Sequence, residues 1–384
     1  MQIGTHFHRA GRTPYPAGLP VSSIRLWDAE LSWKDIEPES GNYQFGALDK
    51  AVNQGLASGI GILYPLGMTP QWASSAPSQP SAYGPGNAAP PADPADWERF
   101  VRTVTRRYRG RISAYEIWNE PNLVAFYSGS VEQLADMTCA AKRILLEEDP
   151  SALLVGPAPT EGEKAVQWLR VFLATDARNC IDVIGIHLYT HSNLPPEGII
   201  PIIDQLKQTL GDARLSQARI WNTEFGWKIS NARVPNRGRV LLPAAARDYL
   251  LRSLLLQASM DIERAYQYSW NHRFMGLAEP DTGEFKDAVD GIRTARRWLD
   301  DEGRISCRPV TAVMLCTNRE GTSMSLIAWS LSDEVVRVPI PWRGCKRVEL
   351  PNGGQRLLNE SDVVYASGSP VRIAPCVRQM TQVP

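Results

Sequence analysis

The stretch "ISAYEIWNEP" at residues 112–121 reads as a short β-strand that stops at an amide, a carboxylate and a proline. Aliphatic and aromatic residues recur up to Trp118, and Asn119 and Glu120 follow at once. Pro121 has no backbone N–H, so the strand has to end there. The segment is either an ordinary strand exit or a strand that presents a reactive side chain at its carboxyl end.

Seven further strand-like runs accompany this one, with helical segments between them. The eight predicted strands are residues 3–8, 22–27, 59–66, 112–118, 152–156, 181–189, 218–224 and 263–270. One intervening helix begins with Asp93 and Pro94, a cap followed by a first-turn proline, and Gly110 closes it. Strands that alternate with helices over about 270 residues predict an α/β protein built as a (β/α)8 TIM barrel. An open doubly wound sheet is the alternative, but no glycine-rich phosphate turn follows the first run.

The sequence changes character after residue 302. Short strand-like runs such as "SMSLIAWSL" and "VVRVPI" are separated by turns, without helices between them. This spacing predicts a small antiparallel β-domain. We therefore expect a catalytic barrel at residues 1–302 and an accessory, sandwich-like β-domain at residues 303–384, packed as a structural partner of the barrel.

Composition excludes several partners and favours an oxidising compartment. The 384 residues include 41 basic and 41 acidic ones, so charge gives no indication of nucleic acid or an anionic membrane as a partner. No apolar run reaches the about 18 residues of a membrane span. Six cysteines without any CxxC pair favour disulfides over a zinc ribbon. We expect a secreted or periplasmic protein whose leader is absent from this sequence, with a cytosolic protein holding free thiols as the alternative.

Polar residues follow several predicted strands, at the end of the barrel where active sites lie. All five histidines fall at or just beyond these strand ends, and Glu120 and Glu224 follow the fourth and seventh strands. Two facing carboxylates suit cleavage of a glycosidic bond, because one protonates the leaving oxygen while the other, ionised, attacks or stabilises the sugar cation. An exposed strand-end charge is the alternative for either glutamate alone. Both, however, lie in aromatic motifs, "WNEP" and "WNTEFGW".

These two motifs carry a resemblance to a known family. "YEIWNEPN" and "IWNTEFGW" resemble the glutamate motifs of the clan A (β/α)8 glycoside hydrolases, and are most like family 39, which includes β-xylosidases and exopolysaccharide hydrolases. "IRLWDAELSWKDIEPESGNYQF" is similar to the strand-two segment of that clan. The resemblance covers roughly residues 1–300. It implies a retaining enzyme with Glu120 as acid/base and Glu224 as nucleophile.

The same resemblance implies roles for the neighbours of the two glutamates. Arg25 would keep the nucleophile ionised, because a nearby guanidinium lowers the pKa of a carboxylate. Asn119 would bind the sugar 2-hydroxyl. His187 and Tyr189 match the strand-six His-x-Tyr pattern and lie on one face of their strand. Trp270 would be the floor on which the reacting sugar packs.

Aromatic side chains near the strand ends suit a carbohydrate cleft, since flat sugar faces stack on such rings. Trp27 and Trp72 are the candidates we add to the site, with core packing as the alternative for each. The loop at residues 67–93 is rich in Pro, Gly, Ala and Ser and is either disordered or a wall of the cleft. Glu116 is expected to be a buried hydrogen-bond partner rather than a catalyst.

Two other protein classes remain as alternatives. A metal-dependent barrel hydrolase would use His6 and His8 on strand one, but strand five ends without a histidine and strand eight without an aspartate. We therefore expect no metal and no cofactor, and the resemblance gives His6 and His8 no role. A non-catalytic sugar-binding barrel would lack one of the two glutamates. We expect a monomer that acts on a carbohydrate, as an endo-acting enzyme on an exopolysaccharide or plant β-glycan, with an exo-acting β-xylosidase as the alternative.

Overall fold

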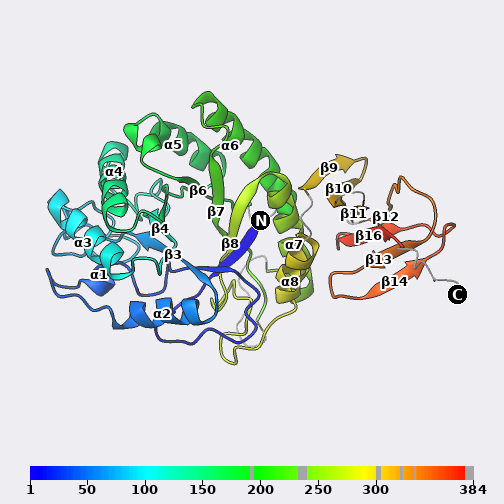
Figure 1. Cartoon of the computed structure of the whole chain (residues 1–384), viewed down its shortest axis with the longest axis horizontal. Helices are drawn as coiled ribbons and strands as arrows, with labels where there is room; N and C mark the ends of the chain where they lie inside the picture. The colour runs from blue at the N-terminus through cyan, green and yellow to red at the C-terminus, as the bar shows by residue number, and fades with distance from the viewer. Residues whose placement is uncertain (191–193, 232–239, 300–303, 321–322, 333, 377–384) are drawn as a thin grey trace, which may run out of the picture.

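The protein is a closed barrel of eight parallel strands joined to a separate β-domain (Figure 1). The computed structural model describes the chain except residues 191–193, 232–239, 300–303, 321–322, 333 and 377–384. The barrel strands are β1 (Gln2–His6), β2 (Ser23–Arg25), β3 (Gly61–Leu66), β4 (Ala114–Ile117), β5 (Leu153–Val155), β6 (Val183–His187), β7 (Arg219–Phe225) and β8 (Ile262–Gln267). Each strand pairs with the next, and β8 pairs with β1. The predicted TIM barrel is confirmed.

Helices surround the barrel, as Figure 1 shows. They are α1 (Trp33–Ile36), α2 (Gly46–Ala57), α3 (Pro94–Arg107), α4 (Val131–Glu148), α5 (Glu163–Leu173), α6 (Ile200–Asp212), α7 (Pro243–Ser259) and α8 (Ala288–Leu299), with 3-10 turns η1 (Asp176–Asn179) and η2 (Pro196–Ile199). Helix α3 begins as its sequence predicts, because the Asp93 side chain accepts a hydrogen bond from the Ala95 backbone and Pro94 stands in the first turn.

The interior of the barrel has two layers. Six residues fill the lower layer, and all are buried: Leu63, Ala114, Val155, Val183, Trp221 and Tyr266. Above them the interior becomes charged, because Arg25 of β2 and Glu116 of β4 meet there, both fully buried. The larger apolar core lies between the strands and the helices, as in other barrels. The charged layer therefore separates the apolar base from the carboxyl ends of the strands.

The C-terminal domain is antiparallel throughout its six-stranded sheet, whose order is β14-β13-β16-β11-β10-β9. Its strands are β9 (Arg304–Val310), β10 (Val313–Glu320), β11 (Ser323–Ser330), β13 (Lys346–Glu349), β14 (Gln355–Leu358) and β16 (Val371–Pro375). A second, two-stranded sheet pairs β12 (Val336–Arg337) with β15 (Tyr365–Ala366), and residues of both sheets share one apolar core. The predicted boundary at residues 302 and 303 lies outside the described residues and stays a prediction.

The β-domain packs on the barrel through apolar residues of β10 and β11, which join the core of the barrel helices, and through polar contacts to those helices. Arg252 of α7 donates two hydrogen bonds to Glu197 of η2, and the Trp329 indole of β11 donates to the same carboxylate at 2.7 Å. Thr294 of α8 donates to the Pro351 carbonyl at 2.6 Å. The β-domain is thereby tied to the side of the barrel.

All six cysteines form disulfides: Cys139–Cys180, Cys307–Cys316 and Cys345–Cys376. The first joins α4 to the segment after η1, and the other two lie within the β-domain. Such bonds persist in oxidising compartments, so they are consistent with an extracellular protein. Among the described residues, the helices lack the combination of length and apolar character that crossing a bilayer requires.

Candidate active site

Arg25 is the centre of the polar cluster at the top of the barrel. Its Nε donates to Glu116 Oε2 at 2.6 Å, its Nη1 to Glu224 Oε2 at 3.0 Å, and its Nη2 to Asn119 Oδ1 at 2.7 Å. Burial disfavours the cation, but Glu116 and Glu224 raise the pKa of Arg25 above its ordinary value. Arg25 therefore stays charged and fixes the positions of three side chains from β4 and β7. Glu116 is the buried partner that the sequence predicted.

Glu120 follows β4 through an unusual backbone path. Trp118 and Glu120 both adopt left-handed φ angles, of 59° and 45°, which are unfavourable for side chains of this size. A hydrogen bond from the Glu120 N–H to the Ala158 carbonyl, 3.1 Å long, holds this turn against the segment after β5. The turn directs the Glu120 carboxylate to His187, whose Nδ1 lies 2.9 Å from Glu120 Oε1. Burial lowers the pKa of His187 to about 4, so this imidazole is neutral at pH 7.

Glu224 lies near the end of β7 and receives hydrogen bonds on both oxygens. Arg25 donates to Oε2, and the Tyr189 hydroxyl donates to Oε1 at 2.8 Å. His6 Nε2 is 3.9 Å from Glu224 Oε2 and donates to the Thr223 carbonyl at 3.0 Å. Burial lowers the pKa of His6 well below its ordinary value, so it too is neutral. Glu224 is thus surrounded by donors, and one of them carries a full positive charge.

The two glutamates approach each other closely. One carboxylate oxygen from each, together with a ring nitrogen of His187, lie within 4.8 Å of one another. Burial raises the pKa of both glutamates to about 7. Because like charges at this distance oppose each other, the pair holds about one proton near neutral pH. Arg25 and Tyr189 donate hydrogen bonds to Glu224, and these bonds favour the anion on Glu224 and the proton on Glu120.

Glu120, His187 and Glu224 are side chains of the types that bind divalent metals. They form the one group of potential metal ligands found among the described residues. Arg25, however, donates to Glu224 at 3.0 Å and holds a positive charge beside it. A second cation at this position would be repelled and would have to displace the guanidinium. The donor set therefore fits a pair of acid and base carboxylates better than a metal centre.

The structure brings together six of the predicted site residues, places Trp27 beside them, and places Trp72 and Trp270 elsewhere. Arg25, Asn119, Glu120, His187, Tyr189 and Glu224 converge as described. Trp72 instead donates through its indole to the Glu37 carbonyl and packs edge-on to Trp33. Trp27 is only 3% exposed, and its indole donates to the Tyr83 hydroxyl at 2.9 Å.

Trp270 also departs from its predicted position. It is 2% exposed and packs edge-on to Phe285 in the core, so its ring has no open face for a sugar. The reason is that β8 ends at Gln267, so Trp270 lies in the segment after the strand and not at its end. Tyr268, half-buried, stands beside His6 with a ring separation of 5.0 Å. We therefore replace Trp270 by Tyr268 as the aromatic residue of strand eight at the site.

Sequence reasoning placed Asp28 and His6 at strand ends but gave neither a role. Both carried a signal, since His6 shares a strand face with His8 and Asp28 follows Arg25 at the end of the second strand. Tyr83 lies in the long loop at residues 67–93. This loop forms a series of turns and reaches the site through the hydrogen bond from Tyr83 to Asp28. Of the two alternatives for this loop, disorder or a wall of the cleft, the structure therefore favours the wall.

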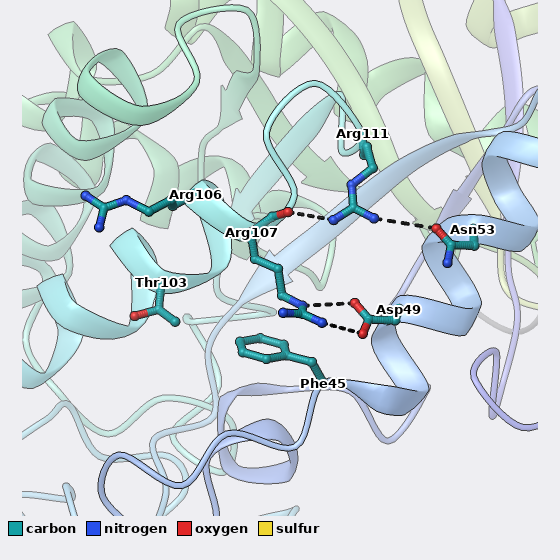
Figure 2. Close-up of a pocket in the computed structure, with 7 residues that line it drawn as sticks. All are labelled: Phe45, Asp49, Asn53, Thr103, Arg106, Arg107 and Arg111. Atoms are coloured by element: carbon teal, nitrogen blue, oxygen red, sulfur yellow. Dashed lines mark hydrogen bonds and ion pairs between the residues drawn. The ribbon is translucent and has the colours of Figure 1, made fainter.

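A hollow of about 590 Å³ lies between α2 and α3 (Figure 2). Arg111, which lines it, precedes β4, so this hollow is at the end of the barrel opposite Glu120. Its arginines already have partners: Arg107 forms two hydrogen bonds with Asp49, and Arg106 pairs with Glu148. We assign no function to it.

Comparisons with known proteins agree with this site. The family model described as glycosyl hydrolase catalytic core matches residues 67–240, and a model described as beta-galactosidase matches residues 19–83. A β-xylosidase from Geobacillus stearothermophilus is 29% identical over 161 residues, which are 38% of this chain and 31% of that protein. The match thus spans about a third of the length of this relative.

Solved structures share the fold across almost the whole chain. A family 39 glycoside hydrolase from Xanthomonas axonopodis pv. citri has a TM-score of 0.66 at 16% identity, covering 98% of this chain and 94% of its own. A family 39 β-xylosidase from Caulobacter crescentus has a TM-score of 0.64 at 16% identity, with 93% and 89% coverage. The model matches and the β-xylosidase relative support a glycoside hydrolase. At 16% identity, the two family 39 structures show that this chain shares their fold.

Proposed function

We propose that the protein is a retaining β-glycoside hydrolase in which Glu120 is the acid and base and Glu224 is the nucleophile. The observation that carries the proposal is the approach of one oxygen of each carboxylate to within 4.8 Å. Retaining enzymes separate their carboxyl groups by about 5–5.5 Å, whereas inverting enzymes need about 6.5–9.5 Å to admit a water molecule. The spacing in this barrel favours the retaining class.

The reaction proceeds in two displacements. In the first, Glu224 forms a bond to the anomeric carbon while Glu120 gives its proton to the glycosidic oxygen, whose bond to that carbon breaks. In the second, Glu120 removes a proton from a water molecule that attacks the anomeric carbon and breaks the ester to Glu224. The proton distribution described above suits the first step, because Glu120 is the protonated member of the pair.

The neighbouring side chains prepare the two glutamates for these steps. Asn119 uses its amide oxygen to accept from Arg25, which leaves its amide N–H groups to donate to the sugar 2-hydroxyl. Tyr189 donates to the nucleophilic carboxylate and aims it. Neutral His187 holds Glu120 in place without adding a charge that would remove its proton.

The substrate we propose is a β-linked oligo- or polysaccharide, cleaved by an endo-acting enzyme. The similarity to a β-xylosidase supports an exo-acting β-xylosidase as the second candidate. A panel of aryl glycosides and polysaccharides, with product sizes measured, separates the two candidates. Short products released only from chain ends would contradict the endo-acting form. We further propose that the protein is a monomer that functions outside the cytoplasm, in keeping with its three disulfides.

Matched glutamine variants test the two catalytic roles. Glu224→Gln should reduce kcat at least about a thousand-fold, since it removes the nucleophile. Glu120→Gln should reduce it about a hundred- to ten-thousand-fold for poor leaving groups and much less for activated aryl glycosides. Glu132→Gln, at an exposed position of α4, is the control for loss of a glutamate. Hydrolysis by Glu224→Gln at the wild-type rate, or an inverted first-formed anomer seen by NMR, would contradict the proposal.

A further inference from the structure

Asp28 is a carboxylate at the barrel mouth that the proposed mechanism does not use. It follows β2 in a left-handed conformation with φ of 53°. Its Oδ1 accepts a hydrogen bond from the Tyr83 hydroxyl at 2.9 Å, and its Oδ2 accepts one from the Tyr268 hydroxyl at 2.6 Å. All three side chains are half-buried, so they are held in place and still reach solvent. Two tyrosines from distant segments thus fix one carboxylate.

Contacts on both sides connect Asp28 to the catalytic pair. On one side, Tyr83 accepts from the Trp27 indole, and the Arg25 guanidinium lies 5.8 Å from the Trp27 ring centre. On the other side, the Tyr268 ring packs against His6, whose Nε2 is 3.9 Å from Glu224 Oε2. Together these contacts form a closed ring. Its members, in order, are Glu224, Arg25, Trp27, Tyr83, Asp28, Tyr268 and His6. Asp28 therefore belongs to the wall that surrounds the two glutamates.

Asp28 forms no ion pair with a cation among the described residues. A hollow of about 180 Å³ beside it also contains Glu30 and Lys34. Glu30 pairs with Arg9 and Arg12, and Lys34 pairs with Asp35 at 2.8 Å, so none of these cations is directed at Asp28.

Two histidines near Tyr268 do not neutralise Asp28 either. His8 and His272 lie with ring centres 5.4 Å from that of Tyr268. Burial lowers the pKa of both, in His272 to about 4, so both are neutral at pH 7. Asp28 thus places a negative charge in the wall that neither histidine offsets.

We propose that Asp28 determines substrate specificity by accepting hydrogen bonds from the sugar bound next to Glu120 and Glu224. This inference rests on the proposed glycosidase function and adds the chemical class of the sugar. A carboxylate offers about four acceptor positions, and the two tyrosines use two of them. The remaining two suit a pair of hydroxyls or an ammonium group. A sugar that carries a carboxylate is repelled by the same charge.

Aryl glycosides of three kinds test this assignment: a neutral sugar, the matching 2-amino sugar and the matching uronic acid. In wild type, kcat/KM should be lowest for the uronide, and the ratio of the other two distinguishes hydroxyl from ammonium recognition. Asp28→Asn should lower kcat/KM for the preferred sugar about ten- to a hundred-fold, because it removes charged hydrogen bonds. It should also reduce discrimination against the uronide at least about ten-fold. Asp136→Asn, at an exposed position of α4, is the control with the same change of charge.

A second variant separates recognition from loss of structure. Tyr268→Phe keeps the charge of Asp28 and removes one of its two tyrosine donors, so it should retain the preference against the uronide while kcat/KM falls. The contrary result is that Asp28→Asn still cleaves the neutral glycoside while its ratio of kcat/KM for the neutral sugar to kcat/KM for the uronide stays within about two-fold of the wild-type ratio. That result would overturn the role of Asp28 and leave the glycosidase function standing. If wild type cleaves none of a broad glycoside panel, the proposed glycosidase function fails, and the role of Asp28 fails with it.

Discussion

Glu116→Gln probes how the buried charge of Arg25 is maintained. Glu116 is fully buried, and its Oε2 lies 2.6 Å from both Nε and Nη2 of Arg25. The substitution keeps the size of the side chain and an acceptor oxygen while it removes the negative charge. Arg25 then has Glu224 as its remaining contacting carboxylate.

The expected loss of stability follows from burial. Removal of one partner from a buried ion pair costs about 3–5 kcal/mol, because the other charge stays buried without compensation. Glu224 still acts as a counter-ion, so we expect the lower end, about 3 kcal/mol. The pKa of Glu224 should fall, since the charge of Arg25 is no longer shared with Glu116. The acidic limb of the pH profile of kcat/KM should therefore move to lower pH.

Denaturant unfolding and a pH–rate profile measure the two effects, with Glu263→Gln as the matched control. Glu263 pairs with Arg219 at 2.6 Å, but these side chains are 38% and 41% exposed. A surface pair of this kind contributes at most about 1 kcal/mol. If the two variants lose the same stability within about 0.5 kcal/mol, and the acidic limb stays in place, the reasoning about Arg25 is refuted.

Three further predictions concern the proton of the glutamate pair and the disulfides. The pH profile of kcat/KM should be bell-shaped around pH 7, because activity requires Glu224 ionised and Glu120 protonated; a profile that stays flat from pH 5 to 9 would contradict this. Glu120→Gln should be more stable than wild type at pH 8, by up to about 3 kcal/mol, and equally stable at pH 4. The sign follows because the pKa of Glu120 is about 7 in the folded protein and 4.5 ordinarily, so ionisation destabilises the native state as the pH rises through that interval. Equal unfolding free energies of Glu120→Gln and wild type at pH 8 would refute this prediction. Replacement of Cys139 and Cys180 by serine should cost about 4 kcal/mol, since their disulfide closes a segment with a separation of 41 residues; denaturant curves unchanged from those of wild type would show that this bond contributes nothing.

The sequence predicted the parts of the site that follow directly from strand order. Arg25, Glu120, Glu224 and His187 lie at or beside the carboxyl ends of parallel strands, and a closed barrel brings such ends to one mouth. The prediction needed only the strand assignments and the resemblance of the glutamate motifs. The buried role of Glu116 followed from its alternation with the strand residues around it.

The sequence did not predict where the chain departs from regular strand geometry. Trp270 was placed at the site by its position just after a strand, but the strand ends at Gln267 and the turn that follows directs Tyr268 inward instead. Tyr83 and Trp72 lie on one long loop, and their positions depend on contacts with Asp28 and Glu37 that no local pattern encodes. Side-chain contacts across loops are set by the packed structure as a whole, so alternation and spacing contain no record of them.

The charged layer inside the barrel is explained by chemistry rather than by stability. A buried ion pair replaced by apolar residues of similar volume often leaves a protein equally or more stable. The layer directly below, with Leu63, Val155 and Trp221, shows that this interior can be filled by apolar side chains. One guanidinium makes three contacts there: it pairs with Glu116, it fixes the Asn119 amide, and it donates to Glu224, which in the proposed mechanism favours Glu224 as the ionised member of the pair. Lysine could not make these three contacts from a single ammonium with the same fixed directions, so the site depends on the planar, multiply donating shape of arginine as well as on its charge.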